Sequence, residues 1–403
     1  MILPEGFIEM MRDLLKEEAD DFLSAMREEP VVSVRINRRK PGAEFIDSTP
    51  VDWCPDGLYL KERPQFIFDP LLHAGAYYVQ DASSMIYQTV VEKILQQLEE
   101  ETGISGITPN VLDLCAAPGG KTTAMINALP DGSKIIANEY VATRANALKE
   151  NLAKWGYRDV SVTNRDSAWF PAQGNRFDIV AVDAPCSGEG MMRKEPKAIE
   201  QWSPELIEKC ATLQKEIIRN AVDSLNDGGF LIYSTCTFNR KENEENAEFI
   251  RDELGLLPFD PQFPKEWGIP SGISTDLPVF RFMPHKTKGE GLFLSIFRKP
   301  GDWAPSIPKS KKLNIKSTKP AKQETPEIED ILACNFDISK YPTAELTESQ
   351  ALAYLRRESI ILSPEIPKGI VIATYKGLPL GAVKNIGNRA NNLYPKGWRI
   401  LKR

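Results

Sequence analysis

Short apolar runs alternate with longer amphipathic segments through the middle of the chain. The runs have the length of buried strands and lie at residues 111–114, 134–138, 160–163, 177–183 and 229–234. Segments with apolar residues at helical spacing lie between them, at residues 121–129, 140–155 and 204–225. Strands that alternate with helices are typical of a parallel, doubly wound sheet. We therefore expect an α/β core from about residue 110 to residue 300.

The two ends of the chain follow different patterns. Residues 1–29 predict helix, residues 31–37 alternate as a strand, and residues 84–101 predict a further helix. Beyond the core, helical spacing returns at residues 345–357, and strand-like runs lie at residues 369–375, 378–384 and 398–401. These patterns predict a small α+β module at each end of the chain.

A segment rich in proline and lysine separates the core from the C-terminal module. It contains Pro305, Pro308, Pro320 and Pro326, and lysines at 309, 311, 312, 316, 319 and 322 with no acidic residue among them before Glu324. This composition favours an extended linker. The predicted division is an N-terminal module at residues 1–90, a core domain at 91–300, a linker at 301–326 and a C-terminal domain at 327–403.

The first strand of the core ends in a glycine-containing turn that leads into a helix. Residues 110–123 read NVLDLCAAPGGKTT. Glycines let the backbone approach a ligand, and a helix N-terminus offers free N–H groups and a positive dipole. A phosphate-binding P-loop would need glycine where Cys115 stands, and the dinucleotide pattern G-x-G-x-x-G is absent. The residues expected to cradle a different ligand are Cys115, Ala116, Ala117, Pro118, Gly119, Gly120 and Lys121.

Acidic residues at successive strand ends favour S-adenosylmethionine as that ligand. Asp113 lies in the first strand, Glu139 ends the second, and Asp166 follows the third. Glu139 would accept hydrogen bonds from both ribose hydroxyls, and Asp166 would meet the adenine amine. Arg144, near the start of the next helix, is a further candidate cofactor contact. An ordinary strand–helix turn with surface acids is the alternative, and acids at three strand ends disfavour it.

Two cysteines follow the next two buried strands. Residues 183–188 read DAPCSG and include Asp183 and Cys186, while residues 234–237 read STCT and include Cys236. Ligands of open α/β sheets bind outside the carboxyl ends of the strands, so both cysteines are expected beside the cofactor. The three motifs together resemble the Sun/RsmB/RsmF family of RNA cytosine-5 methyltransferases. Weaker matches extend over most of the chain.

The resemblance implies a Rossmann-like class I S-adenosylmethionine-dependent methyltransferase core. It also implies a small N-terminal α+β RNA-binding module and a C-terminal PUA-like α+β domain, as in the RsmF branch. The implied activity is methylation of cytosine C5 in RNA, with small-subunit (16S) ribosomal RNA as the expected substrate and transfer RNA as the main rival. A methyltransferase for small molecules or proteins, and a non-catalytic ribosome-assembly factor, are the alternatives from other classes.

Methylation at C5 requires activation, because cytosine C5 is a poor nucleophile until a thiolate adds to C6. A free thiol is mostly protonated at neutral pH, so the site must favour the thiolate. Lys121 and the helix N-terminus would supply positive potential, and Asp183 would share a proton with N3. The residues alone leave Cys186 and Cys236 both open as the nucleophile. The resemblance implies that Cys236 attacks and that Cys186 aids product release, on a base that is unstacked.

Composition limits the cofactors and partners further. Six cysteines without a C-x-x-C pair and two histidines disfavour a zinc site, a disulfide framework and histidine-based catalysis. No apolar run reaches the length of a membrane span and the N-terminus is unlike a signal peptide. We expect a cytoplasmic protein without metal, and nothing in the sequence suggests more than a monomer. The net charge is −6, yet residues 368–403 contain eight basic residues and no acidic one. This tail indicates a phosphate-bearing partner such as RNA.

Several segments outside the core are candidate RNA contacts. Arg35 and Asn37 share a strand face with Ser33 in a stretch that resembles the family's N-terminal RNA-binding module; a sheet rim is the alternative. Residues 189–194 suit a lid or an RNA contact. Tyr375, Tyr394 and Trp398 lie among basic residues and suit base stacking, with core packing as the alternative. Tyr77, Tyr78 and Gln80 are expected to be structural, and His285 structural or RNA-facing rather than catalytic.

Overall fold

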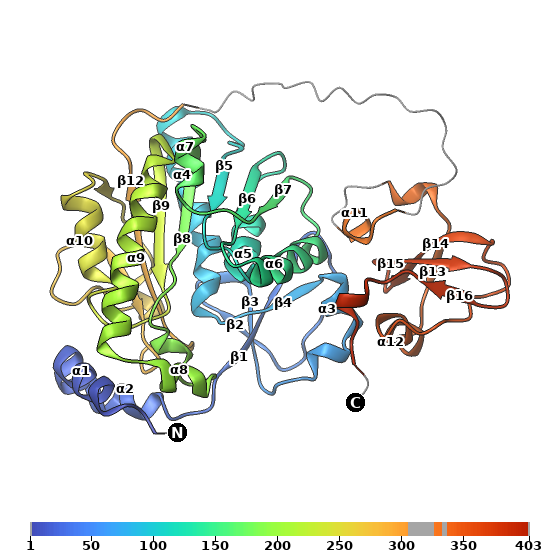
Figure 1. The fold of residues 1–403 in the computed structure, drawn as a ribbon, viewed down its shortest axis with the longest axis horizontal. Helices are drawn as coiled ribbons and strands as arrows, with labels where there is room; N and C mark the ends of the chain where they lie inside the picture. The colour runs from blue at the N-terminus through green and yellow to red at the C-terminus, as the bar shows by residue number, and fades with distance from the viewer. Residues whose placement is uncertain (1, 305–325, 333–336, 402–403) are drawn as a thin grey trace.

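The computed structural model describes residues 2–304, 326–332 and 337–401, which form three β-sheets with their helices (Figure 1). The central sheet has the order β10-β12-β9-β8-β5-β6-β7, with β11 paired to β12. Its strands are β5 (Asn110–Asp113), β6 (Lys134–Asn138), β7 (Val160–Thr163), β8 (Phe177–Asp183), β9 (Leu225–Thr235), β10 (Leu257–Pro258), β11 (Val279–Phe282) and β12 (Leu292–Arg298). Strands β5 to β9 run parallel and β12 runs antiparallel to β9. The predicted doubly wound α/β core is therefore confirmed.

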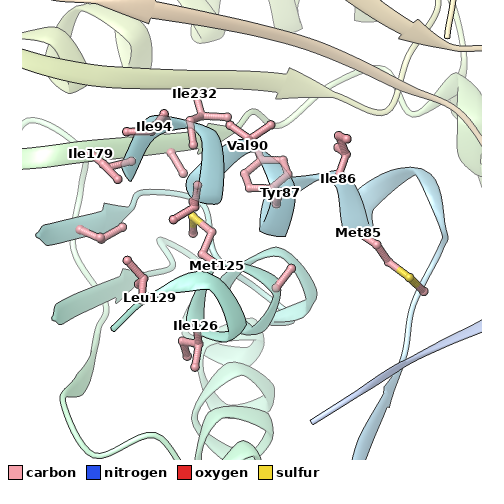
Figure 2. Packing of buried hydrophobic residues seen from close by; sticks show 14 of the residues in the cluster. Met85, Ile86, Tyr87, Val90, Ile94, Met125, Ile126, Leu129, Ile179 and Ile232 are labelled. Carbon is pink, nitrogen blue, oxygen red and sulfur yellow. The ribbon is translucent and has the colours of Figure 1, made fainter. Parts of the chain in front are cut away.

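Helices cover both faces of this sheet. One face carries α4 (Ile86–Thr102), α5 (Gly120–Ala128) and α6 (Ala142–Trp155), and the other carries α7 (Trp169–Ala172), α9 (Pro204–Asp223) and α10 (Glu244–Asp252). Strand β8 shows the resulting alternation: Ile179 packs with Tyr87 and Met125 (Figure 2), whereas Val180 packs in the cluster of α9. A strand that is buried on both sides has a nearly continuous apolar sequence, which explains the apolar run at residues 179–182 of β8.

The N-terminal module is a four-stranded sheet with the order β2-β3-β1-β4. Its elements are β1 (Val32–Ile36), β2 (Thr49–Val51), β3 (Cys54–Leu60), α3 (Pro70–Ala74) and β4 (Tyr77–Val79). The predicted first helix is broken into α1 (Glu5–Leu15) and α2 (Ala19–Ala25), joined by a 3₁₀ turn. These two helices pack with Trp202, Ile207 and Phe238 of the core domain rather than on the module's own sheet.

Strand β1 joins this module to the core domain. The Arg35 side chain is fully buried, and its guanidinium donates to the Thr123 carbonyl at 3.0 Å and the Gly120 carbonyl at 3.3 Å. Asn37 is also buried and donates to the carbonyls of Gly75 and Trp155. The expectation that these side chains face RNA, or lie at a sheet rim, is therefore wrong. Their partners lie 38 to 118 residues away in the sequence, so strand periodicity could not reveal them.

The C-terminal domain contains a second four-stranded sheet, with the order β13-β14-β15-β16. Its elements are α11 (Ile328–Leu332), β13 (Thr343–Glu345), α12 (Glu348–Leu355), β14 (Gly369–Tyr375), β15 (Leu378–Asn385) and β16 (Ala390–Asn392). The predicted strand at residues 398–401 is wrong: Lys396–Trp398 form a 3₁₀ turn after Pro395. The linker residues 305–325 and Cys334 lie outside the described residues.

Aromatic residues of this domain form its core. Tyr394 is fully buried and packs against the ring of Tyr354 at 5.3 Å, so the expectation that it stacks on RNA bases is wrong. Tyr375 and Trp398 are half-buried against the same cluster. The position of an aromatic residue among lysines and arginines therefore did not distinguish a core residue from a base-stacking one.

A buried lysine lies where the three parts of the molecule meet. Lys40 belongs to the N-terminal module, and its ammonium donates to the backbone carbonyls of Ala74, Lys154 and Leu332. These carbonyls are at the C-terminal ends of α3, α6 and α11, where helices carry partial negative charge. The C-terminal domain thereby docks on the core domain beside α3, as Figure 1 shows.

Candidate active site

The predicted cofactor turn is held tightly against α6. Gly119 precedes α5 with φ of 107°, a left-handed conformation that favours glycine, and a Cβ there would lie 3.2 Å from Leu148. Arg144 donates to the Ala117 carbonyl at 2.8 Å, and Asn151 donates to the Pro118 carbonyl at 2.8 Å. Contacts with α6 therefore hold the turn in shape.

A cavity of about 650 Å³ opens at the carboxyl ends of the parallel strands. Seven of the predicted site residues line it: Cys115, Glu139, Arg144, Asp166, Asp183, Cys186 and Cys236. The other predicted residues, Ala116, Ala117, Pro118, Gly119, Gly120 and Lys121, are outside its lining. The cavity therefore brings the acids predicted to bind the cofactor and both cysteines to one place, while most of the glycine turn lies outside its lining.

The cofactor end of the cavity suits the ribose and adenine of S-adenosylmethionine. Glu139 is buried; one of its oxygens accepts from the Val141 N–H at 2.8 Å and the other lies 3.5 Å from the Arg144 guanidinium. Asp166 lies exposed at the rim and accepts from the Ala168 N–H at 2.9 Å. Cavities of roughly 300–1,000 Å³ hold small-molecule ligands. The volume and the two separated carboxylates fit this cofactor.

The other end of the cavity contains two thiols in contact. The Sγ atoms of Cys186 and Cys236 are 3.1 Å apart. The hydrogen bond with Cys236 and burial raise the pKa of Cys186 well above its usual value. Cys186 is therefore a thiol at neutral pH. Burial raises the pKa of Cys54 and of Cys210 to about 11, as expected for packing residues.

A half-buried ion pair lies next to the two cysteines, with Asp183 in the lining of the same cavity. The Lys121 ammonium is 2.8 Å from Oδ2 of Asp183, and Ser234 donates to Oδ1 of Asp183 at 2.7 Å. Burial alone would lower the pKa of Lys121, but the charge and hydrogen bond of Asp183 outweigh it, and the pKa is raised. Lys121 therefore carries its proton next to Asp183, which itself lines the cavity.

Asp113 supports the site from below instead of lining it. It is fully buried and accepts from the Thr122 hydroxyl at 2.6 Å, and burial raises its pKa to about 7. Sequence reasoning missed other lining residues, notably Asn138, Tyr140, Met191 and Leu213. Tyr140 and Leu213 are 71% and 42% exposed. Apolar side chains left exposed next to predicted site residues are visible only once the fold is known.

The segment at residues 189–194 is not a free lid. Glu189 is fully buried, the Gly190 N–H donates to the Cys236 carbonyl at 2.8 Å, and Arg193 donates to the Gly289 carbonyl. The lid prediction is therefore wrong. His285 stands edge-on to the Phe22 ring at 5.7 Å and contacts Glu18, which confirms a structural role. In the described part of the chain no group of three or more His, Cys, Asp or Glu side chains could hold a metal ion, and no helix is suited to crossing a bilayer.

A doubly wound sheet with a cofactor-sized cavity at its switch point, lined by paired acids and two thiols, defines a class I methyltransferase. A family model described as 16S rRNA methyltransferase RsmB/F matches residues 95–298. The chain belongs to this family. Models of the RsmF N-terminal domain and of the RsmF PUA domain match residues 3–82 and 341–400. These matches confirm the predicted family and fold class, and S-adenosylmethionine as the cofactor.

Individual proteins show the same similarity. Ribosomal RNA small subunit methyltransferase F of Cronobacter sakazakii is 33% identical over 319 residues, which cover 74% of this chain and 63% of that protein. The corresponding protein of Pectobacterium carotovorum is 34% identical over 62% of this chain and 53% of its own length. The chain therefore spans less than two thirds of these relatives. Among solved structures, NSun6 from Pyrococcus horikoshii with SFG superposes with a TM-score of 0.61 at 24% identity, covering 74% of this chain and 99% of that one.

Proposed function

We propose that this protein transfers a methyl group from S-adenosylmethionine to C5 of cytosine in RNA, with small-subunit ribosomal RNA as the substrate. The observation that carries the proposal is the pair of thiols, 3.1 Å apart, in the same cavity as the cofactor acids. A methyltransferase acting on a nucleophilic nitrogen or oxygen needs no cysteine, whereas C5 of cytosine needs a nucleophile at C6.

Cys236 is the proposed nucleophile. Its thiolate forms the Sγ–C6 bond, and the C5=C6 electron pair moves to C5. S-adenosylmethionine would supply an electrophilic methyl group; C5 takes it up as the methyl–sulfur bond breaks and the sulfur keeps the electron pair. A base then removes the C5 proton, the electron pair restores C5=C6, and Sγ leaves with its bonding pair. Cys186, held as a thiol 3.1 Å away, donates a hydrogen bond to the departing Sγ.

Lys121 and Asp183 support the same reaction. Negative charge develops on the pyrimidine ring when the thiolate adds, and a proton donor near N3 stabilises it. The pair keeps a proton beside Asp183, which lines the cavity, because Asp183 raises the pKa of Lys121.

RNA as the substrate is supported outside the cavity. Six basic residues of the tail fall within the described residues, and all six are exposed: Lys368, Lys376, Lys384, Arg389, Lys396 and Arg399. They lie in the part of the chain that matches the PUA domain model, which begins at residue 341. The assignment to ribosomal RNA rests on the names of the relatives. The monomeric state and the cytoplasmic location stay predictions.

Covalent trapping tests the proposal. Wild type, Cys186→Ala and Cys236→Ala are incubated with small-subunit ribosomal RNA and labelled cofactor, and denaturation-resistant protein–RNA adducts are counted. We expect Cys186→Ala to accumulate adduct and Cys236→Ala to form none. The reverse pattern would exchange the two roles. Label on transfer RNA alone would favour the rival substrate, and cofactor binding without adduct or product on any RNA would favour a non-catalytic assembly factor.

A further inference from the structure

Two carboxylates lie beneath the paired thiols without lining the cavity. Glu189 follows Cys186 by three residues, Glu242 follows Cys236 by six, and both side chains are fully buried. Neither forms an ion pair within the described residues, so both rely on N–H donors. Burying a carboxylate is costly unless several hydrogen bonds compensate for the lost water. Such a pair next to a reacting centre therefore calls for an explanation.

Glu189 holds the loop that carries the other cysteine. Its Oε2 accepts from the backbone N–H groups of Phe238 at 2.6 Å and Asn239 at 3.0 Å. Its Oε1 accepts from the Trp202 indole at 3.0 Å and the Asn239 side chain at 3.1 Å. Phe238 and Asn239 follow Cys236 directly after Thr237. The Cys236 loop is therefore fixed from the Cys186 side.

Glu242 makes the opposite connection. Its Oε2 accepts from the backbone N–H of Ser187 at 3.0 Å and from the Gln214 amide at 2.7 Å. Its Oε1 accepts from the Asn239 side chain at 2.8 Å. Ser187 is the residue after Cys186, so the Cys186 loop is fixed from the Cys236 side. A hydrogen bond of 2.8 Å between the hydroxyls of Ser187 and Thr237 also joins the two loops.

We propose that Glu189 and Glu242 are positioning residues that act on opposite halves of the reaction. Glu189 sets Cys236 for attack on C6, and Glu242 sets Cys186 for product release. The inference rests on the proposed function. A displacement of ~1 Å at a reacting group can slow a step by roughly 100-fold.

The substitutions Glu189→Gln and Glu242→Gln test this division. Glutamine keeps the shape and one acceptor oxygen, but in either orientation of the amide its NH₂ would face N–H donors that now bond to the glutamate. Single-turnover reactions with the full chain, small-subunit ribosomal RNA and labelled cofactor measure the rates of adduct formation and of product release separately. Glu245→Gln is the matched control, because Glu245 is an exposed carboxylate at the start of α10, three residues after Glu242.

We expect Glu189→Gln to slow adduct formation about 10- to 100-fold without accumulation of adduct. Glu242→Gln should instead accumulate adduct, as Cys186→Ala does, because release is slowed. Equal slowing of both steps in both variants, with the control unchanged, would overturn the proposal. If Cys186→Ala itself traps nothing, the proposed function fails rather than the positioning roles.

Milder variants keep the test decisive if a glutamine variant does not fold. Trp202→Phe removes one donor to Glu189 and keeps a ring, and Gln214→Met removes one donor to Glu242. Each should move the same step as the corresponding glutamate variant by a smaller factor. A shift in the other step would contradict the assignment.

Discussion

At the scale of single residues, burial decides what a polar side chain does. Glu139, Asp183, Cys186 and Cys236 were predictable because each follows a strand whose carboxyl end must face the ligand. Arg35 was not, because nothing local shows that its guanidinium lies beneath the N-terminal sheet, 4.6 Å from the Trp155 ring. Its pKa is lowered to about 10 by burial. A basic residue therefore predicts an RNA contact only when its exposure is known.

His73 gives a pH dependence that belongs to this scale. Its Nε2 donates to the Ile67 carbonyl at 2.9 Å, and burial, helped by the charge of Lys154, lowers its pKa to about 4. The folded state therefore holds His73 neutral. Its contribution to stability is present above the unfolded pKa of about 6.5 and is lost as the pH falls towards 4.

We expect wild type to lose about 2 kcal/mol through this residue between pH 7 and pH 5. His73→Gln cannot titrate, so its stability should fall less over the same interval. Urea unfolding of both proteins at the two pH values measures the difference. Parallel losses in the two proteins would show that His73 is not the group responsible.

At the scale of elements, close packing between elements separates positions that look alike in sequence. Gly75 ends α3 and Gly103 ends α4, both in left-handed conformations with φ of 77° and 69°. A Cβ at Gly75 would lie 1.7 Å from the Lys154 carbonyl oxygen, whereas nothing lies within 4 Å of one at Gly103. Only the first glycine is required by a neighbouring element.

Alanine substitutions should therefore differ in cost. Gly103→Ala should lose roughly 1 kcal/mol, the strain of a left-handed alanine. Gly75→Ala should lose at least about 2 kcal/mol more, because α3 must move away from the end of α6. Thermal unfolding of the two variants beside wild type provides the comparison. Equal losses of stability in the two variants would mean that α3 moves away from α6 at little energetic cost.

The elements themselves were predictable to different degrees. The strands β5 to β9 and their helices follow from apolar runs and helical spacing, since a sheet buried on both faces imposes those patterns. The predicted strand at residues 398–401 is wrong, because a 3₁₀ turn follows Pro395. The predicted single helix at residues 1–29 is wrong, because the 3₁₀ turn at Lys16–Glu18 interrupts it. Which partner each short element packs against depended on long-range contacts.

At the scale of the whole molecule, three exposed cations of the basic tail lie on or beside the C-terminal sheet. Lys384 lies in β15, Arg389 in the turn after it, and the side chain of Lys368 lies against Gly387 in the same turn. Phosphate contacts by such residues release counterions and make binding weaker as salt rises. The division of the chain at residues 90, 300 and 326 stays a prediction, although the described parts pack as three sheets.

The double substitution Lys384→Gln with Arg389→Gln should weaken RNA binding and reduce the slope of log affinity against log salt by about one per lost contact. Lys265→Gln, an exposed cation on the core domain, serves as the control and should leave the slope unchanged. Filter-binding titrations at several salt concentrations measure both. An unchanged slope in the double variant would show that this face does not contact phosphate.

The ammonium of Lys40 has a consequence for substrate choice. Because it bonds to carbonyls at the ends of α3, α6 and α11 together, separating the C-terminal domain would leave a buried cation short of acceptors, which is costly. The Lys40 contacts therefore oppose any change in the distance between the C-terminal sheet and the cavity. The molecule therefore holds its basic residues and its cavity a fixed length apart. Under the proposed function, we expect an RNA to be a substrate when the distance from its contacted phosphates to its unstacked cytosine matches that length, whatever bases lie between them.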